Sequence, residues 1–197
     1  MPKFAIQLDM QRYMIYLKNQ AYTPKDATKL LKRARSLLSN SNVVIRDTRI
    51  SNSRIEFDTS IPENNNMIEE VSQRLSLIAP LSEYDHVVEK KLPKHEAIKY
   101  AISLFNFEKY WSAHEVLESI WKGSHGDERD LLNGIILVAA AFVHDEKDEK
   151  DICISILRRA MKKLNKASGN YFEVDVDKLK HELLRIIETG VIQRFRI

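Results

Sequence analysis

The sequence is poor in cysteine, glycine and proline, and each shortage excludes a class of protein. Cys153 is the only cysteine, so an intramolecular disulfide and a paired-cysteine zinc motif are both excluded. With five glycines and five prolines among 197 residues, the composition is not that of a disordered or collagen-like chain. The chain also lacks a glycine-rich phosphate loop. We therefore expect a folded, globular protein.

Long apolar runs are also missing. The longest one, Ile135 to Val143, is far shorter than the roughly 20 residues of a membrane-spanning helix. The first residues do not form a charged-then-apolar leader. These features predict a soluble, cytoplasmic protein without a membrane partner. A separate expectation concerns Cys153: its isoleucine-rich surroundings predict that the thiol lies in the core.

Positive charge is in small excess, with 31 lysines and arginines against 28 acids, and the excess lies in the first half of the chain. An excess of this size does not by itself indicate nucleic-acid binding. It leaves nucleic acid open as a partner of the first domain. The residues that would contact it are Lys29, Lys32, Arg33, Arg46, Arg49 and Arg54.

Residues 1–92 predict a small α+β domain. A strand at residues 12–17 is followed by a helix that begins at Thr23-Pro24. Two β-rich runs at 43–50 and 54–61 predict a hairpin with one face in water, and a second helix ends at Pro80. A last strand at 84–89 completes the order β-α-β-β-α-β, which is that of a ferredoxin-like fold. An additional strand near residues 4–8 cannot be placed in this order.

Residues 93–197 predict an all-α domain, a bundle of about five helices. Strand patterns end at Leu92-Pro93, and clear breaks occur at 123–126 and 168–170. The expected helices span residues 94–107, 109–122, 127–145, 149–167 and 175–189. The fourth of these is basic on one side, which is typical of a solvated face and leaves an acidic partner open.

The stretch from Phe105 to Trp121 is the most unusual part of the chain, because it contains both tryptophans. At about 100° per residue on a helix, His114 and Glu118 fall on one side next to an apolar arc, whereas Glu115 points away from them. A histidine and a carboxylate one turn apart can share a metal ion. The same residues can instead form a buried polar network, which is the simpler interpretation.

This region resembles the helical family named domain of unknown function three-hundred-nine. The resemblance covers residues 94–185 and is carried by Leu104-Phe105-Asn106, Tyr110 to Glu118, Trp121, Glu128-Arg129, Leu132-Asn133-Gly134 and His144. The chain departs from the family at Asn133, where glutamine is usual, and in the charged segment 145–151. The resemblance implies a compact helical bundle with a polar cluster inside, and it brings no established activity.

The residues of the candidate site follow from an antiparallel arrangement of the second and third helices. Arg129 lies close enough to the turn to pair with Glu118, and Asn133 can approach His114. The predicted polar cluster or ligand-binding site consists of His114, Glu118, Trp121, Arg129 and Asn133.

Three functions remain open. The first is a non-enzymatic binding or adaptor protein for a partner of unknown identity, with the polar cluster as a rigid scaffold. The second is a metal-assisted hydrolase in which His114 and Glu118 hold a divalent metal and Glu115 is the general base; missing ligands would come from a second subunit of a homo-oligomer. The third is nucleic-acid binding by the first domain.

Overall fold

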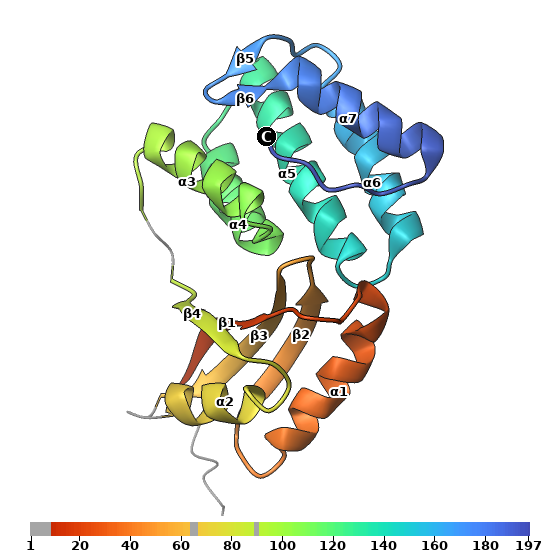
Figure 1. Ribbon diagram of the computed structural model, residues 1–197. Coiled ribbons are helices and arrows are strands. Elements are labelled where there is room, and N and C mark those ends of the chain that lie inside the picture. The colour runs from red at the N-terminus through yellow and green to blue at the C-terminus, as the bar shows by residue number, and fades with distance from the viewer. Residues whose placement is uncertain (1–8, 64–66, 89–90) are drawn as a thin grey trace, which may run out of the picture. The chain divides into compact units, whose positions relative to one another are not determined.

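The computed structural model describes residues 9–63, 67–88 and 91–197. The chain divides into two compact units, Met1–Lys90 and Lys91–Ile197, which we call the N-terminal unit and the helical unit. The additional strand suggested near residues 4–8 lies outside the described residues. Figure 1 labels the elements of both units.

The N-terminal unit is built on a four-stranded antiparallel sheet. Its strands are β1 (Met10–Lys18), β2 (Val44–Ile50), β3 (Arg54–Pro62) and β4 (Leu81–His86), and their order in the sheet is β2-β3-β1-β4. The helices α1 (Ala27–Leu37) and α2 (Met67–Leu75) connect β1 to β2 and β3 to β4, and a short 3₁₀ turn, Pro24–Asp26, precedes α1. This is the βαββαβ order of a ferredoxin-like unit, as the sequence predicted.

Both helices of this unit cover the same face of the sheet (Figure 1). The core between them consists of the apolar side of the strands and one side of each helix, with Leu30, Phe57 and Leu75 almost fully buried. Alternation along β3 places Ile55, Phe57 and Ile61 in this core, because successive side chains of a strand point to opposite faces.

The polar side of the hairpin is not the water-exposed face that the alternation predicted. Glu56 and Asp58 on β3 are buried, and so is Arg49 on the neighbouring strand. Arg49 stands directly opposite Glu56 in the register and forms an ion pair with it. Arg12 on β1 binds both carboxylate oxygens of Asp58 at 2.8 and 2.6 Å. Pairing across strands lets these charges be buried, since each one keeps a charged partner.

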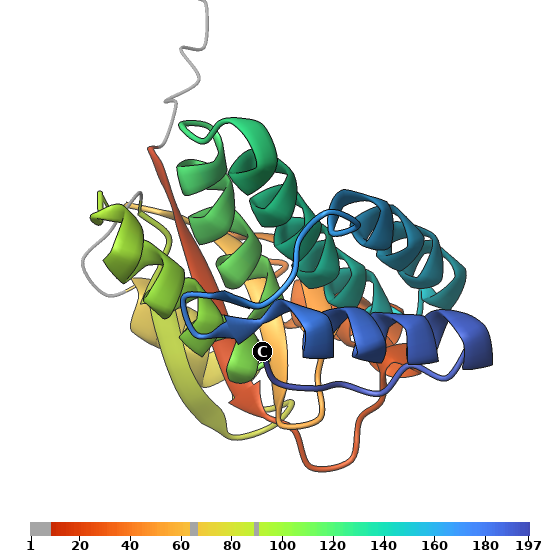
Figure 2. The same ribbon diagram turned by 90° about the horizontal axis from the view of Figure 1, so that it is seen from above.

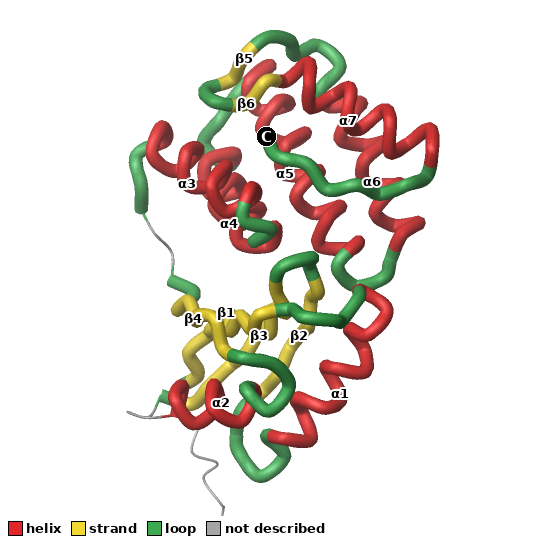
Figure 3. Tube along the Cα trace, in the orientation of Figure 1, coloured by secondary structure: helices red, strands yellow, loops and turns green. Residues whose placement is uncertain are grey.

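The helical unit contains five α-helices within its described residues. They are α3 (Lys94–Asn106), α4 (Tyr110–Trp121), α5 (Gly126–Asp145), α6 (Lys150–Lys163) and α7 (Val176–Thr189). Each bound lies within a few residues of its predicted position, which confirms the predicted bundle. One difference is a pair of two-residue strands, β5 (Asn170–Tyr171) and β6 (Val174–Asp175), in the connection between α6 and α7. Figure 3 shows this strand pair among the helices.

Aromatic side chains form the centre of the helical core. Phe142 on α5 is fully buried, and its ring centroid lies 4.9 Å from that of Tyr110 and 5.8 Å from that of Phe105. Phe195 completes the group from the C-terminal side, at 5.5 Å from Phe142. Residues of α3, α4, α5 and the final segment therefore share one apolar cluster.

The final segment, residues 190–197, turns back after α7 and crosses the helices (Figures 1 and 2). Gly190 makes the turn in the left-handed region, with a φ of 66°, which favours glycine. The Asn106 side chain then pairs with the backbone of Ile197, donating to its carbonyl at 3.0 Å and accepting from its amide at 2.9 Å. Arg194 lies 3.0 Å from Asp145. We call residues 190–197 the C-terminal strap.

None of the described helices combines the length and apolar character needed to cross a membrane.

The predicted core position of Cys153 is confirmed, because this residue has no exposed surface.

Cys153 should therefore be inert in the folded protein. Burial raises the pKa of its thiol to about 12, so the reactive thiolate is almost absent at neutral pH. We expect a thiol reagent such as Ellman's reagent to label Cys153 only in denaturant, with labelling that follows the unfolding of the helical unit. Rapid labelling without denaturant would contradict the buried position.

Candidate metal centre

Helix α4 positions the candidate site. Its residues Tyr110, Ala113 and Leu117 are buried against the rest of the helical unit. Spacings of three and four residues place these three on one side of the helix. The polar residues 114, 115 and 118 consequently point away from the centre of the core. Part of the surface of each side chain stays in contact with solvent.

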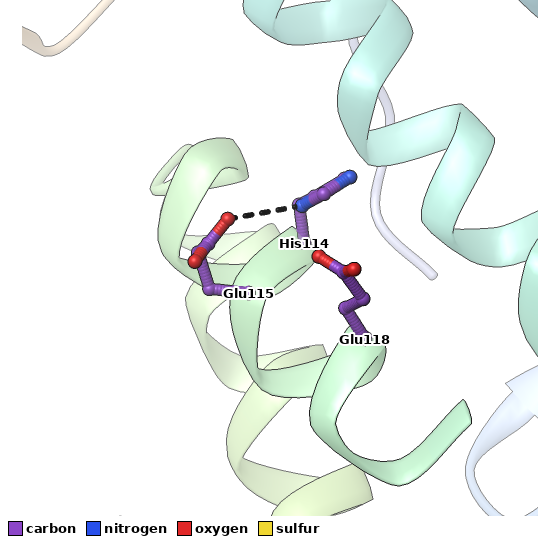
Figure 4. Close-up of side chains that lie close together, drawn as sticks. All are labelled: His114, Glu115 and Glu118. Atoms are coloured by element: carbon purple, nitrogen blue, oxygen red, sulfur yellow. Dashed lines mark ion pairs between the residues drawn. The ribbon is translucent and has the colours of Figure 1, made fainter. Parts of the chain in front are cut away.

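His114, Glu115 and Glu118 lie close enough together to share an ion. One ligand atom of each residue can be chosen so that all three atoms lie within 4.8 Å of one another. The His114 Nδ1 atom lies 3.4 Å from Glu115 Oε1, and Glu118 lies next to the histidine on the following turn (Figure 4). Their side chains are 27%, 47% and 37% exposed, so the cluster is accessible from solvent.

The position of Glu115 differs from the prediction. The helical angle between residues 114 and 115 was expected to point Glu115 away from the cluster, yet its carboxylate reaches back to the imidazole. A glutamate side chain is long enough to cover this angle because its three rotatable bonds extend the carboxylate well beyond the helix surface. Glu115 therefore belongs with the possible ligands.

The predicted four-residue network of His114, Glu118, Arg129 and Asn133 is not formed within the described part of the chain. Arg129 donates to the backbone carbonyls of Trp121 and Ser124 at 3.2 and 3.1 Å, and its guanidinium lies 4.0 Å from the centre of the Trp121 ring. Glu118 instead lies 3.8 Å from Lys122. The carbonyl oxygens of the last α4 residue and of the turn that follows it attract the guanidinium, and the indole face adds a cation–π contact.

Asn133 and Trp121 have no polar side-chain contact with the cluster. The Asn133 side chain has no hydrogen-bond partner within the residues described. The Nε1 atom of Trp121 is buried, and it too has no partner in the described part of the chain. Trp121 therefore acts as a packing surface for Arg129, and the cluster on α4 is smaller and more exposed than predicted.

The candidate nucleic-acid residues are distributed over both sides of the sheet. Lys29, Lys32 and Arg33 are exposed on α1, whereas Arg49 and Arg54 alternate with core residues and face the opposite side. Arg49 pairs with Glu56, and Arg54 lies 3.4 Å from Glu83. The remaining residue, Arg46, donates to the Ser60 hydroxyl at 2.7 Å. The acidic partners of Arg49 and Arg54, and the distribution of the cations over two sides of the sheet, both reduce the positive potential that a phosphate backbone would meet.

Several motif residues have structural roles that no sequence pattern indicated. Asn106 holds the C-terminal strap, and Gly134 leaves room for α6, because a Cβ atom at this position would lie 2.6 Å from side-chain atoms of Leu164. His144 lies 2.5 Å from Glu149 across the turn between α5 and α6. The apolar residues Ile192, Phe195 and Ile197 of the strap pack against the helical core, but they do not indicate which helix the strap meets.

Fold and site together define a mixed α+β protein whose helical unit presents a histidine–carboxylate cluster on α4. This unit belongs to the family described as Domain of unknown function (DUF309), whose model matches residues 98–156. The match begins within α3 and ends within α6, so it is shorter than the span of 94–185 suggested by the resemblance.

A crystal structure of a conserved hypothetical protein from Thermus thermophilus is similar to part of the chain. The identity is 30%, the alignment covers 49% of this chain and 98% of the other, and the TM-score is 0.42. No curated protein matches the sequence.

Proposed function

We propose that the helical unit is a metal-binding module in which His114, Glu115 and Glu118 hold a divalent transition-metal ion. The observation that carries this proposal is the convergence of one imidazole nitrogen and two carboxylate oxygens within 4.8 Å. Ligand atoms that bind one ion at a metal–ligand distance of about 2.0–2.2 Å lie closer to one another than 4.8 Å. Small side-chain rotations must therefore bring the three ligand atoms together to complete the site. The partial exposure of all three side chains allows such rotations.

The donor set favours a transition metal over calcium or magnesium. Imidazole nitrogen is typical of zinc, iron, copper and nickel sites, whereas calcium and magnesium prefer oxygen donors alone. Two carboxylates beside one imidazole also suit manganese. Zinc(II), manganese(II) and iron(II) are therefore the ions to test first.

Three ligands from one helix occupy one side of an ion and leave the opposite side open. An open position can hold water or a ligand from a partner, and catalytic zinc sites keep such a position. Hydrolase chemistry would additionally require a general base. Since Glu115 lies among the ligands, it cannot also act as the base in the way the sequence suggested. The geometry thus supports binding of the ion more directly than hydrolysis.

Metal titration of the protein purified without chelator tests the proposal. We expect about one equivalent of zinc(II) or manganese(II) by isothermal titration calorimetry, and His114→Ala or Glu118→Gln should weaken binding by about 10–100-fold. Affinity should also fall as the pH is lowered, because protons compete with the ion for the same nitrogen and oxygen atoms.

Matched substitutions on α7 separate specific from general losses. His181→Ala and Glu188→Gln remove the same side-chain types at exposed positions, and both should bind metal as the parent does. Binding that survives His114→Ala unchanged, or a parent protein that takes up none of the three ions, would rule out this site.

A further inference from the structure

A second candidate binding site lies in the helical unit, away from the cluster on α4. A cavity of about 480 Å³ lies between the first turns of α5, the end of α6 and β5, at the end of the unit where Figure 1 shows the two short strands. This volume lies within the range of about 300–1,000 Å³ that is typical of small-molecule pockets.

Exposed ion pairs occupy part of the charged lining of this cavity. Lys163 on α6 lies 2.8 Å from Asp130 on α5. Glu128 accepts a hydrogen bond from the Tyr171 hydroxyl at 2.9 Å and lies 2.5 Å from Lys94. The hydrogen bond from Lys94, followed by that from Tyr171, lowers the pKa of Glu128. These charges are therefore already compensated within the protein.

Three other charged residues of the lining form no ion pair, although Lys166 lies near enough to Asp130 to interact with its charge. Lys162, Lys166 and Asp127 line the cavity, and none of them has an ion pair or side-chain hydrogen bond within the described residues. Lys162 lies in the last turn of α6 and Lys166 lies in the turn that follows this helix, so both lysines belong to the same wall of the cavity. Asp127 belongs to the first turn of α5, on the other wall. The cavity thus offers two cations on one side and one carboxylate on the other.

Neutral donors and an apolar surface complete the lining. Asn165, Ser168 and Asn170 supply side-chain donors next to the two lysines, and Leu131, Ala167 and the Tyr171 ring supply apolar area. A phosphate monoester has a charge of about −1.5 to −2 and three acceptor oxygens. It matches two lysines and several neutral donors, whereas a simple anion would leave Asp127 without a partner. A protonated amine on the same molecule would supply that partner.

We propose that this cavity binds a small phosphorylated amine, with the phosphate between Lys162 and Lys166 and the ammonium group at Asp127. This site does not depend on the metal proposed for α4, because the two share no residue. An anion alone would pair only with the two lysines, and an amine alone would pair only with Asp127. The ligand with both groups should therefore bind more tightly than either fragment.

Three probes separate the contributions of the two groups. Phosphoethanolamine carries both charges, inorganic phosphate carries only the anion and ethanolamine carries only the amine. In ¹⁵N–¹H correlation spectra of the full chain, we expect phosphoethanolamine to shift the amides of residues 162–171, with an affinity about tenfold above that of phosphate. Ethanolamine should give the weakest response.

Substitutions then assign the charges. Lys162→Ala combined with Lys166→Ala should weaken phosphoethanolamine binding by about tenfold or more. Asp127→Asn should remove the advantage in affinity that phosphoethanolamine has over phosphate, while phosphate binding stays intact. The matched control is Lys150→Ala, which removes an exposed lysine at the opposite end of α6 and should change nothing.

Two results would overturn the proposal. Equal affinity for phosphate and phosphoethanolamine would show that Asp127 does not receive an amine. No amide shift in residues 162–171 at millimolar phosphoethanolamine would show that the cavity does not bind this class of ligand. Because the cavity and the cluster on α4 share no residue, neither result would affect the test of the metal centre.

Discussion

Replacing Arg194 with alanine should lower the free energy of unfolding of the helical unit by about 3–5 kcal/mol. The Arg194 side chain is 10% exposed and lies 3.0 Å from Asp145 and 3.9 Å from Glu108. Glu146 adds a further negative charge that acts on the same guanidinium. Without Arg194, these carboxylates would face one another in a partly desolvated site.

The loss caused by Arg194→Ala should depend on pH. Burial raises the pKa of Asp145, and the charge of Arg194 opposes this rise. In the variant, the folded-state pKa should therefore lie further above the unfolded value. Such a carboxyl group costs no stability when it is protonated in both states, and it destabilises the fold as the pH rises through the folded-state pKa. The difference from the parent should thus shrink as the pH is lowered from about 7 toward about 4.

Urea unfolding followed by tryptophan fluorescence measures this effect in the correct unit, because both tryptophans lie in α4. Arg185→Ala is the control: its side chain is 36% exposed and pairs with Glu182, so a loss of at most about 1 kcal/mol is expected. Adding Asp145→Asn to Arg194→Ala should restore part of the stability. Equal losses in the two arginine variants at every pH would contradict a buried ion-pair cluster.

Replacing Phe142 with alanine should cost about 3–5 kcal/mol, through the lost burial and the cavity that remains. Phe142 has no exposed surface, and its ring contacts Phe105, Tyr110 and Phe195. The variant should also loosen the C-terminal strap, because Phe195 loses one of its aromatic partners. The same fluorescence-detected unfolding gives the magnitude.

A double-mutant cycle with Phe195→Ala tests the connection to the strap. We expect a coupling energy of about 0.5–1.5 kcal/mol between positions 142 and 195. Phe107 is 62% exposed, so Phe107→Ala serves as the control and should have little effect. Additive losses at positions 142 and 195 would show that the strap contributes independently of the aromatic cluster.

The motif residues of the helical unit have different roles in the structure. Phe105 and Tyr110 build the aromatic core, Asn106 binds the strap and Gly134 allows α6 to approach α5. Among the described residues, His114, Glu115 and Glu118 are the one group of three such ligands close enough together to bind an ion. Most motif residues of the helical unit are therefore needed for packing, and three of them form one candidate metal site.

Apart from the short strands β5 and β6, the order and type of the helices and strands could be predicted from the sequence alone. Hydrophobic periodicity and turn residues are local signals, and neighbouring residues carry them without reference to the rest of the fold. The βαββαβ order restricts the ways in which the strands can pair, and the observed order β2-β3-β1-β4 is the ferredoxin-like one. The breaks at 123–126 and 168–170 likewise separated the helices of the second unit.

Only the tertiary structure decided which polar groups meet. Asn106 and Ile197 are 91 positions apart, and no local pattern indicates that the strap returns to α3. Arg129 binds the carbonyls at the end of α4 rather than Glu118, and the Glu115 side chain turns toward His114. Such contacts depend on side-chain rotamers and on the path of distant segments, whereas the sequence by itself determined the elements that bring these groups within reach.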